Sequence, residues 1–158
     1  MAITSKFANW RFAALAGGLA ASVFVVAALS ILLSRDYTQI AAIWPVNAII
    51  VATLIGKERA LWGPLLIPAY LATIAANLVT GNSPVLAILF PAANFAEIVF
   101  CSWLLTHQNI PQFEAGRGGD FVRLLVGATV GAVCSAGIAT IVIMLQSDVA
   151  PLSLFLSW

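Results

Sequence analysis

The sequence predicts an all-α integral membrane protein, and three observations lead to this fold class. Of the 158 residues, 62% are hydrophobic and only 8% are charged, whereas soluble domains carry about 25% charged residues. The mean hydropathy is +1.04. The apolar residues also form long segments that charges, prolines or glycines separate. Seven basic and six acidic side chains cannot supply the polar surface of a soluble globule, so a soluble enzyme, a disordered tail and a secreted disulfide scaffold are excluded.

Five segments are long enough to cross a bilayer. A spanning helix needs about 20 mainly apolar residues, because the hydrocarbon core is roughly 30 Å thick and a helix rises about 1.5 Å per residue. The predicted spans cover residues 12–33, 38–55, 61–79, 84–106 and 121–145. A further apolar run, from Pro151 to Trp158, stops before it can span anything. We therefore expect residues 1–158 to form a single transmembrane domain of five helices and the start of a sixth, incomplete at its C-terminal end.

The basic residues predict the orientation, because Lys and Arg are retained on the cytoplasmic side of a membrane. Alternate loops, counted from the N-terminus, hold Lys6, Arg11, Lys57, Arg59, Arg117 and Arg123. The opposite side holds Arg35 alone. The N-terminus is therefore predicted to be cytoplasmic, and the lipid bilayer is the first partner of this multi-pass chain.

Polar residues inside the predicted spans are the candidate functional residues, because their burial in hydrocarbon is costly unless they face a partner or a cavity. Glu97 is the only charged residue near the centre of a span. Asn94 lies three residues before it and Cys101 four residues after it, which places all three on one helical face. Pro91 on the same helix predicts a kink.

Polar residues of neighbouring spans predict a pocket around Glu97. If the helix faces converge, a cavity that opens to the outside is lined by Trp44, Asn47, Tyr70, Thr73, Asn77, Asn94 and Glu97. Its functional interpretation is a site for an unknown small ligand or for proton sensing. The alternative is hydrogen bonding between helices, at about 0.6 kcal/mol per bond. We favour the alternative for Asn47, Thr73 and Asn77, and the functional interpretation for Glu97, because glutamine would meet a purely structural need.

Small residues at four-residue intervals predict close helix packing. The last predicted span carries Gly127 and Gly131, followed by Ser135, and the first span carries Gly18 between Ala14 and Ser22. Such stripes let helix backbones approach each other in a membrane. Packing within the chain is favoured over the two alternatives, a homodimer and docking of another membrane-protein partner.

Several chemistries have no motif in the sequence. There is no phosphate-binding loop, no HExxH and no Ser/His/Asp constellation, and the two cysteines lack CxxC spacing. We therefore expect no catalytic residue, no metal and no cofactor in this chain, which is not predicted to be an enzyme itself. A net charge of +1 provides no basic surface for nucleic acid.

The order of several short motifs resembles that of a known family. The motifs are Trp44-Pro45 opening a helix, Lys57-Glu58-Arg59 after Gly56, Ala76-Asn77 before Thr80-Gly81, Asn94-Phe95-Ala96-Glu97, and Phe121-Val122-Arg123-Leu124-Leu125 starting the last span. Together, residues 40–158 resemble the first class of membrane-associated sensor (MASE) domains. This chain departs from the family where Val46-Asn47-Ala48 stands in place of an early glycine, and the later helices are missing.

The resemblance implies an all-helical sensory domain of the bacterial inner membrane. Such domains have about eight spans and are usually fused to a cytoplasmic output, such as a histidine kinase or a diguanylate cyclase, which here would lie beyond residue 158. The predicted function is thus an input domain that passes a signal through helix packing. The alternative is a small membrane transporter, or a substrate-binding membrane subunit, that uses Glu97 as a midplane carboxylate.

Overall fold

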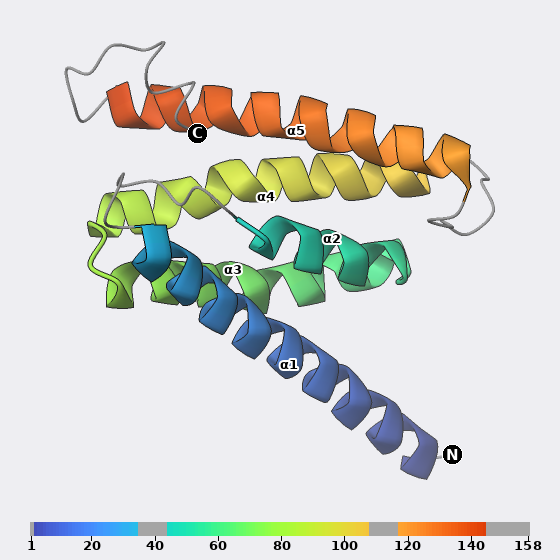
Figure 1. Cartoon of the computed structure of the whole chain (residues 1–158). Helices are drawn as coiled ribbons and strands as arrows, with labels where there is room; N and C mark the ends of the chain where they lie inside the picture. The colour runs from blue at the N-terminus through green and yellow to red at the C-terminus, as the bar shows by residue number, and fades with distance from the viewer. Residues whose placement is uncertain (1, 35–43, 108–116, 145–158) are drawn as a thin grey trace.

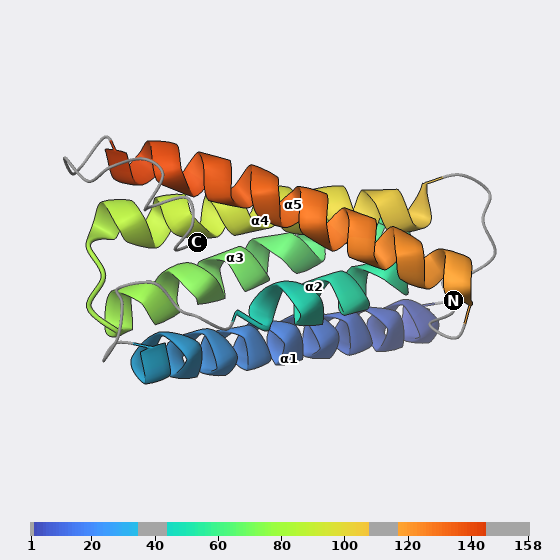
Figure 2. The same ribbon diagram turned by 45° about the horizontal axis from the view of Figure 1, so that its top comes forward.

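The computed structural model describes residues 2–34, 44–107 and 117–144, and every regular element in these ranges is a helix (Figure 1). The elements are α1 (Ala2–Ser34), α2 (Val46–Ile55), the short 3-10 helix η1 (Arg59–Leu61), α3 (Trp62–Val79), α4 (Pro84–Thr106) and α5 (Gly118–Met144). α1 packs on α3, α3 on α4, and α4 on α5, while α2 contacts α1, α3 and α4. Figure 2 shows α1 at one edge of this bundle and α5 at the other.

Within the described residues, four helices are long and apolar enough to cross a membrane, which confirms the predicted all-α membrane fold. They cover Trp10–Leu33, Arg59–Val79, Pro84–Thr106 and Gly118–Val142. The last of these begins before the predicted residue 121, whereas α4 has the bounds of the predicted span 84–106. Proline suits the first turn of a helix, and the Ser83 hydroxyl accepts a hydrogen bond from the amide of Leu86 at 3.4 Å. Residues 145–158, where a sixth helix is expected to start, lie outside the described ranges.

The described part of the second predicted span is a short helix. α2 has ten residues, which corresponds to about 15 Å, or half the thickness of the hydrocarbon core. It begins after Pro45, whose carbonyl oxygen accepts the first helical hydrogen bond from the amide of Ile49 at 3.2 Å. Proline is tolerated at such a position because the first amides of a helix have no intrahelical acceptor. Residues 38–43 of the predicted span lie outside the described residues.

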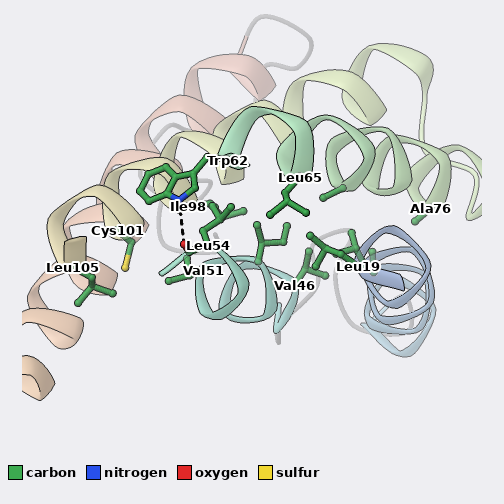
Figure 3. Packing of buried hydrophobic residues seen from close by; sticks show 14 residues of the cluster. Leu19, Val46, Val51, Leu54, Trp62, Leu65, Ala76, Ile98, Cys101 and Leu105 are labelled. Carbon is green, nitrogen blue, oxygen red and sulfur yellow. Dashed lines mark hydrogen bonds between the residues drawn. The ribbon is translucent and has the colours of Figure 1, made fainter. Parts of the chain in front are cut away.

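The apolar core lies where α1, α2, α3 and α4 meet (Figure 3). Most of its members on the first two helices recur every four residues, which places them on one face of each helix: Leu19, Val23 and Ala27 on α1, and Val46, Ile50 and Leu54 on α2. Leu65 of α3 and Ile98 of α4 are among its other members. Large apolar side chains such as Leu33 and Val79 are exposed instead, as expected where hydrocarbon is the solvent.

Gly18 does not form the helix contact that its spacing predicts. It is exposed, and no heavy atom outside its own helix lies within 4 Å of the position that a Cβ atom would occupy. The face that packs lies next to it, because Leu19 and Val23 present larger side chains to the core. Removing these side chains from contact would lose more dispersion attraction than separating small residues would. Among the described residues, the prediction for Gly18 is therefore wrong.

One buried indole fixes the turn between α2 and α3. The Trp62 Nε1–H group donates to the carbonyl oxygens of Leu54 at 3.1 Å and of Lys57 at 3.3 Å, and the first of these bonds is drawn in Figure 3. Carbonyl groups at the end of a helix have no intrahelical donor. The indole therefore satisfies polar groups that would otherwise be left unpaired at the end of α2.

We expect Trp62→Phe to lower the free energy of unfolding by about 1–2 kcal/mol, because the ring remains buried while the carbonyl oxygens lose their donor. The measurement is unfolding in detergent micelles followed by circular dichroism. Trp10→Phe is the matched control, since Trp10 is 58% exposed. Equal stability of Trp62→Phe and the unmodified chain would show that the indole does not fix this turn.

Candidate functional site

A cavity of about 330 Å³ lies between the helices, a volume within the usual range of small-molecule sites. Six described residues with a nitrogen or oxygen atom in the side chain line it: Trp44, Asn47, Asn77, Asn82, Asn94 and Glu97. The apolar lining comes from the end of α1, from α2, α4 and one face of α5. Segments that are distant in the sequence therefore form one cavity with both polar and apolar walls.

A hydrogen bond between α2 and α4 lies in this cavity. The Asn47 side-chain Nδ2 donates to Oε2 of Glu97 at 2.9 Å. Asn47 belongs to the first turn of α2 and follows Pro45 closely, while Glu97 lies in the middle of α4. The bond thus joins the start of α2 to the middle of α4.

Two buried polar atoms of the cavity residues have no hydrogen-bond partner in the described part of the chain. They are Nε1 of Trp44 and Oδ1 of Asn47. Burying a polar atom without a partner costs about 1–3 kcal/mol. One donor and one acceptor with this cost therefore belong to residues that line the same cavity as Glu97.

The polar face of α4 lies directly on the small-residue stripe of α5. The closest point is Gly131, where an added Cβ would come within 2.7 Å of Cγ and 3.6 Å of Cα of Glu97. Real Cβ atoms essentially never make a contact as short as the first. Only glycine at position 131 leaves room for Glu97 in its present conformation.

The same stripe contacts α4 on either side of Glu97. One turn away, an added Cβ at Gly127 would lie 3.2 Å from Sγ of Cys101. In the other direction, the Ser135 hydroxyl donates to Oδ1 of Asn94 at 3.4 Å. The close packing predicted for Gly127, Gly131 and Ser135 thus forms within the chain, and it involves the residues that share a face with Glu97.

Two residues of the predicted pocket lie away from the cavity. The Tyr70 hydroxyl donates to the carbonyl oxygen of Ile88 at 2.8 Å, and its ring packs edge-on against Phe95 at 4.9 Å between centroids. The Thr73 hydroxyl is buried and donates to the carbonyl oxygen of Ala69 in its own helix at 2.9 Å. The hydroxyl of Tyr70 is therefore used in the α3–α4 contact, and that of Thr73 within α3. Contrary to the prediction, neither residue lines the cavity.

The remaining predicted residues meet in the cavity, together with others that the sequence analysis did not select. Asn82 donates from Nδ2 to Oδ1 of Asn77 at 2.7 Å, which joins the turn after α3 to the cavity wall. Leu124, Ala128 and Ala132 of α5 complete the wall. Their four-residue spacing indicates one helical face, but spacing alone does not say which helix or cavity that face meets.

The functional groups that line the cavity can form hydrogen bonds to a small molecule. They are one carboxylate, several amides, an indole and the thiol of Cys101. In the ranges that the structure describes, no group of three or more His, Cys, Asp or Glu residues could hold a metal ion. Fold and cavity together define a multi-pass helical membrane domain with an internal polar site.

Residues 14–158 match the MASE1 family, and the chain belongs to this family. MASE1 is a family of membrane sensor domains of signalling proteins, so the chain is a membrane-embedded sensory domain that is not itself catalytic. The match includes most of α1 as well as the motifs further along the chain. Comparisons with curated proteins and with solved structures gave no match.

We expect Gly131→Ala to lower the free energy of unfolding by about 1–3 kcal/mol, the usual cost of overpacking a well-packed interior. The new methyl group forces either the Glu97 side chain or α5 to move. Gly137→Ala is the matched control on the same helix, because no heavy atom outside that helix lies within 4 Å of the added Cβ. Thermal unfolding in detergent measures both, and equal loss of stability in the two variants would contradict the role of the Glu97–Gly131 contact.

Proposed function

We propose that this chain is the input domain of a bacterial inner-membrane signalling protein and that it controls a cytoplasmic output such as a histidine kinase or a diguanylate cyclase. The contact between the cavity and α5 carries this proposal. Glu97 lines the cavity and also fills the space that Gly131 leaves open. A ligand that contacts the carboxylate therefore acts on a group that already touches the neighbouring helix.

The signal would pass through the α4–α5 contact. Because helix interfaces are close-packed, a displacement at one side chain is taken up by the neighbouring backbone rather than by free space. Glu97 has little room to move toward Gly131, so a ligand that shifts the carboxylate favours a different placement of α5. The ligand can shift the equilibrium between the two placements of α5 only to the extent that it binds one of them more tightly than the other.

The proposed orientation places the end of the cavity that Asn82 lines toward the outer side of the membrane. In Figure 2, the N-terminus and the beginning of α5 lie at one end of the bundle, and the turn between α3 and α4 lies at the other. The first end carries Lys57, Arg59 and Arg117, and basic residues favour the cytoplasm. Asn82, which lines the cavity, belongs to the turn at the opposite end.

Reporter fusions test this orientation. We expect alkaline phosphatase to be active when fused after Gly81 and inactive when fused after Lys57, because the enzyme requires export. A green fluorescent protein fused at the same two positions should give the reverse pattern. A reporter that behaves as cytoplasmic after Gly81 would overturn the proposed orientation.

The signalling function is tested in the protein that carries this domain. We expect the coding sequence to continue past Trp158 into an output domain, whose autophosphorylation or cyclic dinucleotide synthesis can be measured in membranes. Glu97→Gln and Gly131→Ala should change this output by about fivefold or more, a ratio at the lower end of typical coupling between sites. Gly137→Ala should leave it unchanged. Output that is insensitive to Glu97 and Gly131 would contradict the proposal.

The carboxylate in the middle of α4 also favours a second candidate, a small transporter or a substrate-binding membrane subunit. Intramembrane carboxylates recur in ion and proton pathways. Proton- or ion-coupled uptake into vesicles that is lost in Glu97→Gln, without any dependence of a signalling output on Glu97, would support this candidate over the sensor.

A further inference from the structure

We propose that the cavity binds a small organic ammonium ion. This inference depends on the proposed function, because it names the ligand class of the same sensory cavity. It is argued from the charge of the lining residues, from the hydrogen bonds that they already make, and from the two aromatic residues among them.

The described lining of the cavity carries an acidic side chain and no basic one. Glu97 is the only Asp, Glu, Lys or Arg among the described residues that line the cavity. Its hydrogen bond comes from a neutral amide, that of Asn47. The ion pairs within the described ranges lie elsewhere, between Asp120 and the side chains of Arg117 and Arg123. Charged groups in membrane spans are usually paired, and a bound cation would supply the missing partner of this carboxylate.

Two of the four cavity amides donate through their nitrogen atom, which leaves their oxygen atom to accept a hydrogen bond. Asn47 uses Nδ2 to bind Glu97, while its Oδ1 has no partner among the described residues. Asn82 likewise uses Nδ2 to bind Asn77. A carboxylate accepts hydrogen bonds from an ammonium group more strongly than from a neutral donor. The cavity therefore favours a cation over an anion, which would meet the carboxylate without any basic side chain to offset it.

Two aromatic residues strengthen the preference for an organic cation over a metal ion. Trp44 and Phe90 both line the cavity, and aromatic rings attract ammonium groups through the negative potential of their faces. Among the described residues, no group of three or more His, Cys, Asp or Glu side chains could hold a metal ion. The cavity volume of about 330 Å³ is large enough for an alkylammonium ion and much larger than a bare metal ion requires.

The direct test is isothermal titration calorimetry of the purified chain in a detergent without choline groups. The probes are choline, tetramethylammonium, ethanolamine and putrescine, and the neutral control is dimethylbutanol, in which carbon replaces the ammonium nitrogen of choline. We expect at least one ammonium probe to bind, and the tightest of the four to bind about tenfold more tightly than dimethylbutanol, the ratio that corresponds to about 1.4 kcal/mol. Absence of binding by all four ammonium probes, or binding of dimethylbutanol as tight as that of the tightest ammonium probe, would overturn the inference.

Variants locate the binding. Glu97→Gln should weaken ammonium binding about tenfold or more, whereas Glu58→Gln removes the same charge from an exposed turn outside the cavity and should have no effect. Because Glu97→Gln could also disturb folding, Phe90→Leu provides a second variant, and it should weaken choline binding more than dimethylbutanol binding. Circular dichroism shows whether each variant is folded. Ammonium binding that is unchanged in both Glu97→Gln and Phe90→Leu would place the site elsewhere and contradict the inference.

The outcome also separates this inference from the proposed function. If no ammonium probe binds but Glu97→Gln still changes the signalling output, the ligand class is wrong and the sensory role remains supported. If an ammonium probe binds but the output does not depend on Glu97 or Gly131, the ligand class stands and the proposed signalling route is wrong.

Discussion

The contact of the Glu97 carboxyl side chain with Gly131 is the constraint on which the rest of the site depends. A carboxylate within a membrane span needs polar partners, because hydrocarbon provides none. Here α2 supplies the Asn47 amide at 2.9 Å, and α5 supplies space by lacking a side chain at position 131. α4 contacts both helices, so one side chain couples three elements that come from different parts of the sequence.

The lining of the cavity and the contact between α4 and α5 use the same residues. Asn94, Glu97 and Cys101 line the cavity, and each of them also contacts the α5 stripe. In many proteins a binding site is connected to a moving element through intervening side chains. Here that distance is a single contact, so the ligand of the proposed function acts on α5 through Glu97 directly.

The two ends of α2 have different roles in the structure. The described helix begins only after Pro45, and the residues at its start, Trp44 and Asn47, line the cavity. Its opposite end is held by Trp62, which satisfies the terminal carbonyl groups. The apolar core formed by Ile50 and Leu54 anchors the helix between these two ends.

The sequence by itself determined the properties that depend on local pattern and on solvent. The all-helical membrane fold follows from apolar length, since unpaired backbone groups are not tolerated in hydrocarbon, and the shared face of Asn94 and Glu97 follows from the helical period. Only the tertiary structure decided which faces meet, because the rotation of a helix about its axis is set by its neighbours and not by its own residues. For this reason Gly131 packs while Gly18 is exposed, the polar groups of Tyr70 and Thr73 are used outside the cavity, and Asn82 and Ala128 line it.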